Sequence, residues 1–313
     1  MSKKYAIGID LGGTNLRVAL VSEEGEILRK IKTVSSDDVV AALCGSIAQI
    51  GYEGVAGIGV GTAGIIDKKN GRVYVSPNLR AVEGVEIVTE VRSRFGLPVF
   101  IENDANAAAL GERIRGAGRE YDNFVLLTLG TGIGGGIVYK GKLLEVSAEI
   151  GHMSINSEAE KCPCGNIGCL ENYASARAMV SRTVAFIEKG SESILKDCCK
   201  GNIYKLTPED IYRAALDGDA LGREILKDAG KYLGVGLANI INMMSPDAII
   251  LTGGLTGAWN IYVQEAIKEA SRRAFKDLFD SVKIIPSLLG DDAGTIGAAC
   301  LVFRSISGDT AVF

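Results

Sequence analysis

The sequence predicts an α/β protein made of two duplicated domains that flank a cleft, and three observations support this. Apolar residues alternate along a strand at 5–11, which leads into the glycine-rich turn Gly12–Asn15 and a return strand at 16–22. The same order recurs in the second half, where a strand at 123–129 is followed by the turn GTGIGGG and a return strand at 136–139. The length of 313 residues also suits two domains.

The remaining elements alternate between strands and helices, as an α/β fold requires. In the first half the pattern predicts strands at 26–34, 55–60, 72–75 and 98–102, and helices at 38–50, at 86–95 and after Asp104. In the second half it predicts strands at 248–252 and 283–286, and helices at 174–190, 208–216, 219–243, 260–278 and 294–304. With a joint near 115–119, the expected domains are 1–116 plus a C-terminal helix at about 300–313, and 117–299.

Composition argues against several classes of function. The net charge of −4 offers no basic surface for nucleic acid or for an acidic membrane, and no stretch reaches the ~18 apolar residues of a membrane span. The apolar run near the N-terminus is too short for a signal peptide. The seven cysteines are an odd number, which fits a reducing compartment better than a disulfide framework. We therefore expect a cytoplasmic protein with neither a nucleic-acid nor a membrane partner.

The stretch Glu149–Glu171 contains the only histidine of the chain and three cysteines. An imidazole and three thiolates form a complete tetrahedral ligand set for zinc, and four protein ligands indicate a structural ion. Gly165 and Gly168 allow the sharp turns that such a set requires. Buried apolar thiols are the alternative, because the cysteine spacing alone is not decisive. The candidate ligands are His152, Cys162, Cys164 and Cys169.

Two acids lie beside the candidate metal ligands, and four further cysteines lie elsewhere in the chain. Glu149 and Glu171 bracket the candidate metal ligands, and a metal that holds two acids in place is suited to a ligand rich in hydroxyl groups. The other cysteines are expected to be ordinary thiols, namely Cys44, Cys198, Cys199 and Cys300.

The two glycine-rich turns have the composition of phosphate-binding loops, because glycines let backbone N–H groups approach phosphate oxygens closely. A glycine pair that merely closes a hairpin is the alternative, but two such turns in duplicated domains favour a bound nucleotide. Asp10 ends its strand and suits Mg²⁺ held through water. The candidate nucleotide residues are Asp10, Gly12, Gly13, Thr14 and Asn15, then Gly130, Thr131 and Gly132, and, in a third turn expected beside the adenosine, Gly253 and Gly254. A plain turn between a strand and a helix is the alternative for this third turn.

Asp104 follows a predicted strand at the start of a helix and is the candidate catalytic base. Transfer of a phosphoryl group to an alcohol needs an acceptor for the hydroxyl proton. A helix N-cap is the alternative for Asn103 and Asp104, and the two roles are compatible. Two earlier turns offer Gly64 and Asn78 as further candidates for contacts with a sugar, although on their own these turns are plain loops.

Taken together, these segments resemble the ROK family (repressors, open reading frames and sugar kinases) of the actin-like ATPase/hexokinase superfamily. The matching segments, in family order, are DLGGTNLRVAL, ENDANAAALGE, LTLGTGIGGGIV, EIGHM, CPCGNIGCLE and LTGGL. The resemblance implies two actin-like ATPase (ribonuclease H-like) domains, and a sugar kinase that uses Mg-ATP and contains a structural zinc. It implies that the glycine turns bind phosphates, that Asp104 is the base, and that the sugar is contacted by Asn103, Asp104, Glu149, His152 and Glu171.

Glucose is the expected substrate, because ENDANAAALGE and EIGH look most like the glucokinase branch of the family, which acts in glycolysis. Fructose, N-acetylmannosamine, N-acetylglucosamine and allose stay open as alternatives. Family kinases often carry proline where Ala63 stands, which blurs the choice of sugar. The family's repressors carry a helix-turn-helix ahead of the first strand, for which a strand at residue 5 leaves no room, so a sugar-sensing repressor is a remote alternative. A homodimer or a dimer-based oligomer is expected.

Overall fold

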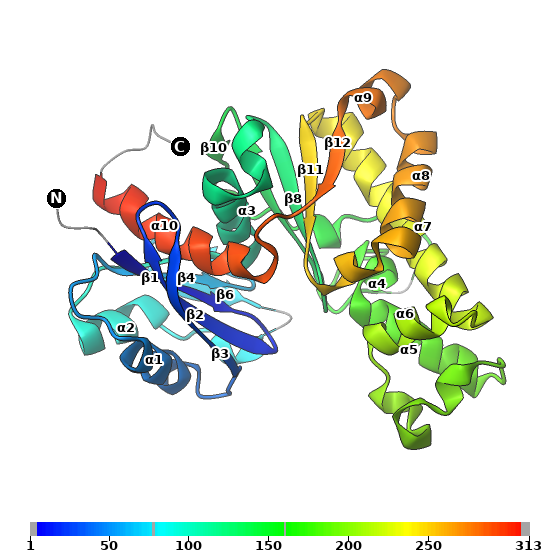
Figure 1. Ribbon diagram of the computed structural model, residues 1–313, viewed down its shortest axis with the longest axis horizontal. Coiled ribbons are helices and arrows are strands. Elements are labelled where there is room, and N and C mark those ends of the chain that lie inside the picture. The colour runs from blue at the N-terminus through cyan, green and yellow to red at the C-terminus, as the bar shows by residue number, and fades with distance from the viewer. Residues whose placement is uncertain (1–4, 77–78, 160, 308–313) are drawn as a thin grey trace. The chain divides into compact units, whose positions relative to one another are not determined.

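The computed structural model describes residues 5–76, 79–159 and 161–307. The chain divides into two compact units, of which unit 1 comprises Met1–Leu126, Gly135–Ala148 and Ser287–Phe313, and unit 2 comprises Leu127–Gly134 and Glu149–Pro286 (Figure 1).

The first sheet has the strand order β3-β2-β1-β4-β7. Its first three strands form an antiparallel meander of β1 (Tyr5–Leu11), β2 (Asn15–Ser22) and β3 (Ile27–Val34). The strands β4 (Ile58–Thr62) and β7 (Val99–Asn103) continue the sheet in parallel from β1. A separate small hairpin consists of β5 (Ile65–Asp67) and β6 (Arg72–Val75).

The second sheet repeats this order as β10-β9-β8-β11-β12, again with its first strand in third place. Its strands are β8 (Phe124–Leu129), β9 (Ile133–Tyr139), β10 (Lys142–Leu143), β11 (Ala248–Thr252) and β12 (Lys283–Pro286). The duplication predicted from the two hairpins is therefore confirmed, and each sheet has the strand order of a ribonuclease H-like, actin-like ATPase domain.

Strand alternation in unit 1 sends successive side chains to two different helix layers. Ile7 and Ile9 pack into a core with α1 (Val39–Ile50) and α2 (Ile87–Phe95), which lie together on one face of the sheet in Figure 1. Ala6 and Ala19 pack on the other face with Ala299, Val302 and Phe303 of α10 (Ala293–Ser307).

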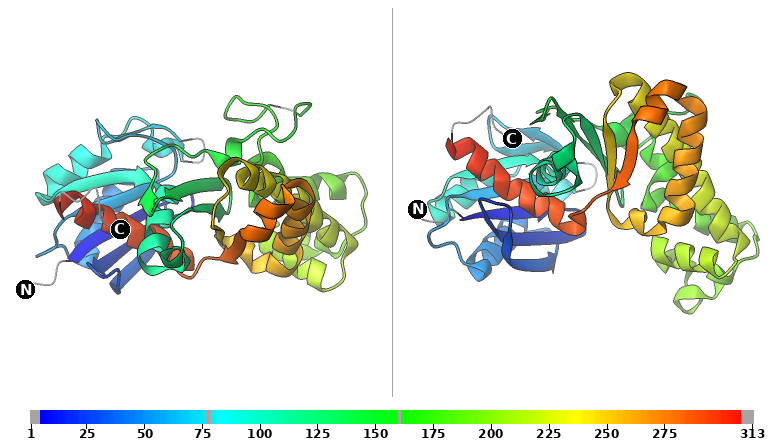
Figure 2. Two further views of the ribbon diagram at one scale, coloured as in Figure 1. Left: turned by 90° about the horizontal axis from the view of Figure 1, so that it is seen from above. Right: turned by 45° about the horizontal axis from the view of Figure 1, so that its top comes forward.

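Glycines allow α10 to lie directly on the first sheet, a crossing visible in Figure 2. A Cβ atom on Gly8 would lie 1.9 Å from the carbonyl oxygen of Thr295, and one on Gly59 would lie 1.8 Å from that of Ala298. The helix α3 (Asp104–Arg115) approaches α10 as closely, because a Cβ atom on Gly297 would lie 1.6 Å from the oxygen of Ala107. No larger residue fits without backbone movement.

Replacing Gly59 by alanine should therefore destabilise the protein by about 1–3 kcal/mol, the usual cost of overpacking. The matched control is Gly45→Ala in the exposed face of α1, where no atom of the described residues lies within 4 Å of the added atom. That change should stabilise by up to ~1 kcal/mol, because alanine favours helix over glycine. Urea denaturation of both variants measures the difference, and equal midpoints would contradict the tight packing of α10.

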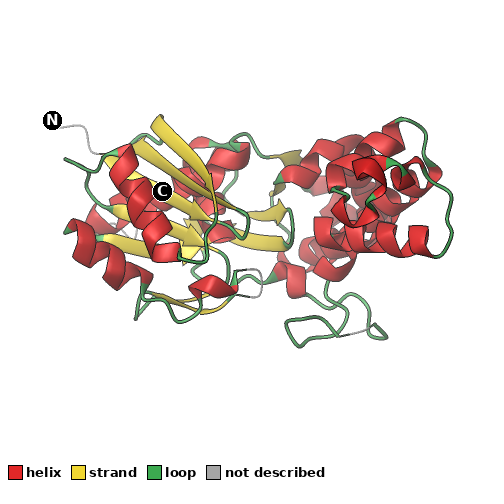
Figure 3. Cartoon of the chain, turned by 90° about the horizontal axis from the view of Figure 1, so that it is seen from below, coloured by secondary structure: helices red, strands yellow, loops and turns green. Residues whose placement is uncertain are grey.

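Unit 2 is rich in helices (Figure 3). They are α4 (Glu171–Ala174), α5 (Ala176–Glu188), α6 (Pro208–Leu216), α7 (Ala220–Met244), α8 (Gln264–Arg273) and α9 (Lys276–Ser281). The long α7 begins one residue after its cap Asp219, close to the predicted 219–243. In the described part of the chain, no helix combines the length and the apolar character that crossing a membrane requires.

Two predicted helices need correction. The stretch 174–190 is broken at Ser175, whose side chain caps the new helix α5 by accepting from the Ala178 amide. The stretch 260–278 begins with a π-turn at Trp259–Val263 and breaks at Ala274 between α8 and α9. The last helix, predicted at 294–304, is confirmed as α10 from Ala293 to Ser307; of the stretch at about 300–313 that was expected to join the first domain, residues 308–313 lie outside the described residues.

Candidate functional site

The first glycine turn, Gly12–Asn15, closes the β1–β2 hairpin of unit 1. Its ends are tied together because the amide of Gly12 donates to the Asn15 carbonyl at 3.0 Å. The hydroxyl of Ser35 donates to the Gly12 carbonyl at 2.6 Å, so the turn is also fixed by the residue that follows β3. Gly12 thus shapes the turn, while Gly13 and Thr14 are exposed at its tip, where their backbone can meet an anion.

Asp10 lies opposite Arg17 across the hairpin, and their side chains form an ion pair at 3.0 Å. Arg17 also pairs with Asp291 at 2.9 Å. Burial raises the pKa of the Asp10 carboxyl, and Arg17 works against that shift. The carboxylate proposed for magnesium therefore already has a cation on one oxygen, which the sequence analysis missed. A turn of four residues places positions 10 and 17 opposite each other, so the hairpin register could have revealed it.

Asn103 ends β7 and caps α3, and its side-chain amide makes three hydrogen bonds. Its Oδ1 accepts from the backbone amides of Ala105 at 2.9 Å and Asn106 at 3.2 Å. Its Nδ2 donates to the Gly64 carbonyl at 3.1 Å. These partners fix the orientation of the amide and, among the described residues, leave one of its hydrogens for an acceptor such as a sugar hydroxyl.

Asp104 is the first residue of α3, where the helix N-terminus stabilises a carboxylate. Its Oδ1 accepts from the Ala105 amide at 2.8 Å. The structure brings Asp104, Asn103 and Gly64 together at the ends of β7 and β4 in unit 1. Gly64 has φ +114°, and a Cβ atom there would lie 2.4 Å from the Val75 oxygen, so only glycine fits. Asn78, the other predicted sugar contact, lies outside the described residues.

The second glycine turn, Gly130–Gly132, belongs to unit 2 and is closed by a hydrogen bond that spans one residue less than in the first turn. The amide of Gly130 donates to the Gly132 carbonyl at 3.0 Å, and the Gly130 carbonyl accepts from Ala176 at 2.9 Å. Thr131 is exposed at the tip. The third turn lies close by, because a Cβ atom on Gly253 would be 2.5 Å from the oxygen of Leu129, the last residue of β8. Gly254 has open space beside it.

The predicted metal ligands form a Cys3His cluster in unit 2, comprising His152, Cys162, Cys164 and Cys169. All four ligand atoms lie within 4.8 Å of one another. Gly165 and Gly168 have φ values of +94° and +69°, which confirms that the segment turns at these two glycines. The cluster is also tied by its backbone, since the Asn166 side chain donates to the His152 carbonyl at 2.9 Å.

The spacing of the ligand atoms fits a tetrahedral ion. Cys164 Sγ and Cys169 Sγ are 3.7 Å apart, and Cys162 Sγ lies 3.9 Å from His152 Nδ1. Two sulfurs that each lie ~2.3 Å from a tetrahedral zinc would be about 3.8 Å apart. Burial, together with the two neighbouring thiols, raises the pKa of Cys169 to about 12. A divalent cation reverses this effect, because a coordinating thiol is deprotonated outright.

Of the two acids that flank the cluster, Glu171 packs against the second glycine turn. Glu171 is buried, and its Oε2 accepts from the amide of Ile133 at 2.8 Å, immediately after the turn. Its Oε1 pairs with Arg177 at 2.7 Å, a partner that the sequence analysis missed. Glu149 is exposed and its carbonyl accepts from the His152 amide at 2.9 Å. Glu171 thus connects the cluster to the phosphate-type turn.

Fold and site together define a duplicated actin-like ATPase-type protein with a glycine turn in each unit and a Cys3His cluster in the second. The model of the ROK family matches residues 6–305, so the chain belongs to the ROK family.

Sugar kinases and repressors are both among the relatives that are similar to this chain. A glucokinase of Thermotoga maritima is 36% identical over 98% of this chain and 100% of its own length. A xylose repressor of Caldicellulosiruptor bescii is 32% identical over 96% of this chain and 78% of its own length. The crystal structure of a ROK family glucokinase from Streptomyces griseus with glucose and AMPPNP has a TM-score of 0.85 at 33% identity, covering 96% of this chain and 99% of that one.

Proposed function

We propose that this protein is an ATP-dependent sugar kinase that phosphorylates the 6-hydroxyl of a hexose, with glucose as its preferred substrate. The observation that carries the proposal is Asp104 at the N-terminus of α3, beside an Asn103 amide that has one hydrogen left to donate. The similarity to two glucokinases supports the choice of sugar.

In the proposed reaction, Asp104 accepts the proton of the 6-hydroxyl as that oxygen bonds to the γ-phosphorus of ATP. The bond from the γ-phosphorus to the bridging oxygen breaks, and the products are hexose 6-phosphate and ADP. Asn103 orients the sugar by donating its remaining N–H. Backbone amides of the two glycine turns hold the phosphates. Mg²⁺ bound with the nucleotide neutralises phosphate charge, and Asp10 is the candidate carboxylate for its water shell.

We also propose that the Cys3His cluster holds a structural zinc that fixes the sugar-binding residues of unit 2. Four protein ligands leave the ion no open position for chemistry. In this proposal His152 binds both the metal and the sugar. Its Nδ1 faces Cys162 Sγ and would bind the metal, and its Nε2 would hydrogen-bond a sugar hydroxyl. Glu149 and Glu171 are the proposed acidic contacts of the sugar in the same unit, and Gly253 and Gly254 are the proposed adenosine-side residues.

Turnover with a panel of sugars tests the proposal. The purified chain is assayed with Mg-ATP and glucose, fructose, N-acetylmannosamine, N-acetylglucosamine or allose while ADP release is followed. We expect the highest kcat/KM with glucose, and phosphorus NMR of the product should show the phosphate on O6. Xylose is the matched control, since its pyranose form lacks the CH₂OH group of glucose and offers no 6-hydroxyl.

The similarity to a xylose repressor gives a second candidate function, the sensing of a sugar without catalysis. The same panel separates the two functions. A sensor would bind one sugar in calorimetric titration and release no ADP with any of them. Glucose-dependent ADP release at a rate typical of kinases, ~1–100 per second, would exclude it.

A further inference from the structure

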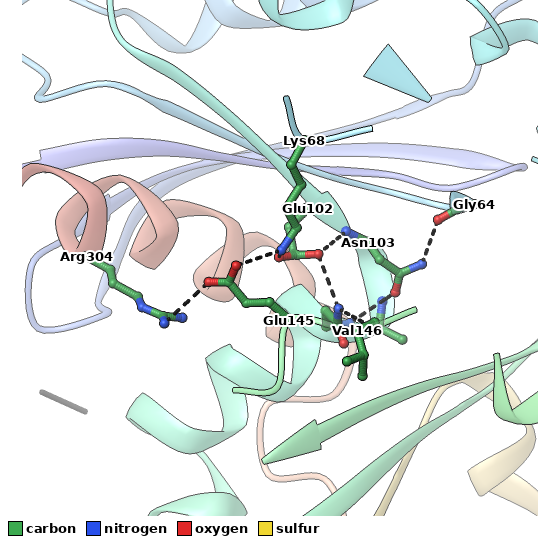
Figure 4. A network of polar contacts seen from close by, with 9 residues as sticks. Gly64, Lys68, Glu102, Asn103, Glu145, Val146 and Arg304 are labelled. Carbon is green, nitrogen blue, oxygen red and sulfur yellow. Dashed lines mark hydrogen bonds and ion pairs between the residues drawn. The ribbon is translucent and has the colours of Figure 1, made fainter. Parts of the chain in front are cut away.

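Glu102 is a buried acid directly before the proposed sugar-binding and catalytic residues, and it has no role in the reaction described above. It is 4% exposed at the end of β7. Its Oε1 accepts from the backbone amide of Asn103 at 2.9 Å and from the Asn106 side chain at 3.2 Å (Figure 4). The carboxylate therefore contacts the backbone at the point where the strand becomes the helix that starts with Asp104.

Lys68 supplies the positive charge for this buried acid. Its Nζ lies 2.5 Å from Glu102 Oε2 and 3.3 Å from Glu145 Oε2. Lys68 follows β5, four residues after Gly64, whose carbonyl accepts from Asn103. The β5–β6 hairpin thus contacts the β7–α3 junction twice, through the Lys68 ammonium and the Gly64 carbonyl.

Two more contacts hold the same network from other parts of unit 1. Asn106 donates to the Val146 carbonyl at 3.1 Å as well as to Glu102, so both of its amide hydrogens are used. Arg304 of α10 lies 3.4 Å from Glu145 Oε1. The orientation of the Glu102 carboxylate is therefore set by the hairpin, by α3 and by the segment at Glu145–Val146, as Figure 4 shows.

We propose that Glu102 is a positioning residue for Asn103 and Asp104, and that Lys68 holds it in place. The inference rests on the proposed kinase function. Through its bond to the Asn103 amide, Glu102 fixes the direction in which the strand enters α3, and so the placement of the sugar-orienting amide and of the base. A small displacement of such groups is enough to slow a reaction strongly.

The test compares Lys68→Met with Lys68→Arg, and with Lys69→Met at the exposed neighbour. With glucose and Mg-ATP, Lys68→Met should lower kcat by about tenfold to hundredfold and raise the KM for the sugar, while the KM for ATP stays within about twofold. Lys68→Arg, which keeps the charge, should recover most of the loss, and Lys69→Met should behave as the unmodified chain.

A merely structural ion pair would give a different result. If the pair only stabilises the fold, Lys68→Met lowers the thermal midpoint and the amount of active protein, and leaves both KM values unchanged; that outcome overturns the inference. If Lys68→Met does not fold, Glu102→Gln takes its place, because glutamine keeps the size of the side chain but removes the charge by which Lys68 holds it. A folded Glu102→Gln with the normal kcat and sugar KM also overturns it. An unmodified chain that phosphorylates no hexose would overturn the proposed function itself, and this inference with it.

Discussion

Replacing Asp104 by asparagine should reduce kcat by at least ~100-fold, the scale on which a positioned general base accelerates proton transfer. An amide cannot accept the proton of the 6-hydroxyl. The substitution keeps the shape of the side chain, and its oxygen can still accept from the Ala105 amide that now donates to Asp104 at 2.8 Å. Calorimetry should therefore show sugar binding in the variant even though turnover is lost.

Asp38→Asn is the matched control for this change. Asp38 caps α1 and accepts from the Ala41 amide at 3.0 Å, so the same substitution removes a charge from another helix N-terminus of unit 1. Both variants lose the ~0.3–1 kcal/mol that a carboxylate gains at such a position, but only Asp104→Asn should lose activity. Near-normal turnover in the Asp104 variant would place the proton acceptor elsewhere.

Loss of the metal should have the second large effect, which is on sugar binding and on the thermal midpoint. Cys164 is the exposed ligand of the Cys3His cluster, so Cys164→Ala removes one ligand without opening a cavity in the core. Loss of outer-sphere partners lowers metal affinity by about 10–100-fold, and loss of a direct ligand should cost at least ~100-fold. Because Glu171 follows the cluster and holds the Ile133 amide, we expect weaker sugar binding and a lower thermal midpoint, with ATP affinity much less affected.

Metal content by mass spectrometry and calorimetric titration of sugar and nucleotide measure these effects. Cys198→Ala, in the same unit but outside the cluster, should retain zinc and both affinities. An active unmodified protein without zinc would refute the structural role. A stripped protein that binds sugar normally but transfers no phosphate would instead make the ion catalytic.

The sequence predicts the architecture well where local pattern decides it, and poorly where distant groups do. The hairpins follow from alternation and glycine, and α7 from a long apolar period with an Asp cap. The break at Ser175 was missed because a side chain remote in sequence stabilises it. The Tyr262 hydroxyl donates to the Ala174 carbonyl at 2.8 Å. The strand β5 was missed because three residues are too few for a pattern.

The residues of the candidate site could likewise be predicted where the local sequence determines them, but not where distant groups do. The Cys3His cluster needs only residues of rare chemistry close together in sequence, so it was found. The sequence also indicated a cap at the start of α3, but the choice of Asn103 over Asp104 depends on the Gly64 carbonyl that fixes the Asn103 amide. Arg177 and Lys68 were missed, because a common charged residue gives no signal until the fold brings it to Glu171 or Glu102.

The close contact of α10 with Gly8 and Gly59 also determines the order in which the chain can fold during synthesis. The face of the first sheet that carries these glycines can be covered only after residues 293–307 have left the ribosome. At ~5–20 residues per second this takes on the order of tens of seconds after the first strand is made. The helices of unit 2 are complete before that time. The domain synthesised first is therefore the last to become complete, and until then the face that carries Gly8 and Gly59 lacks the helix that covers it.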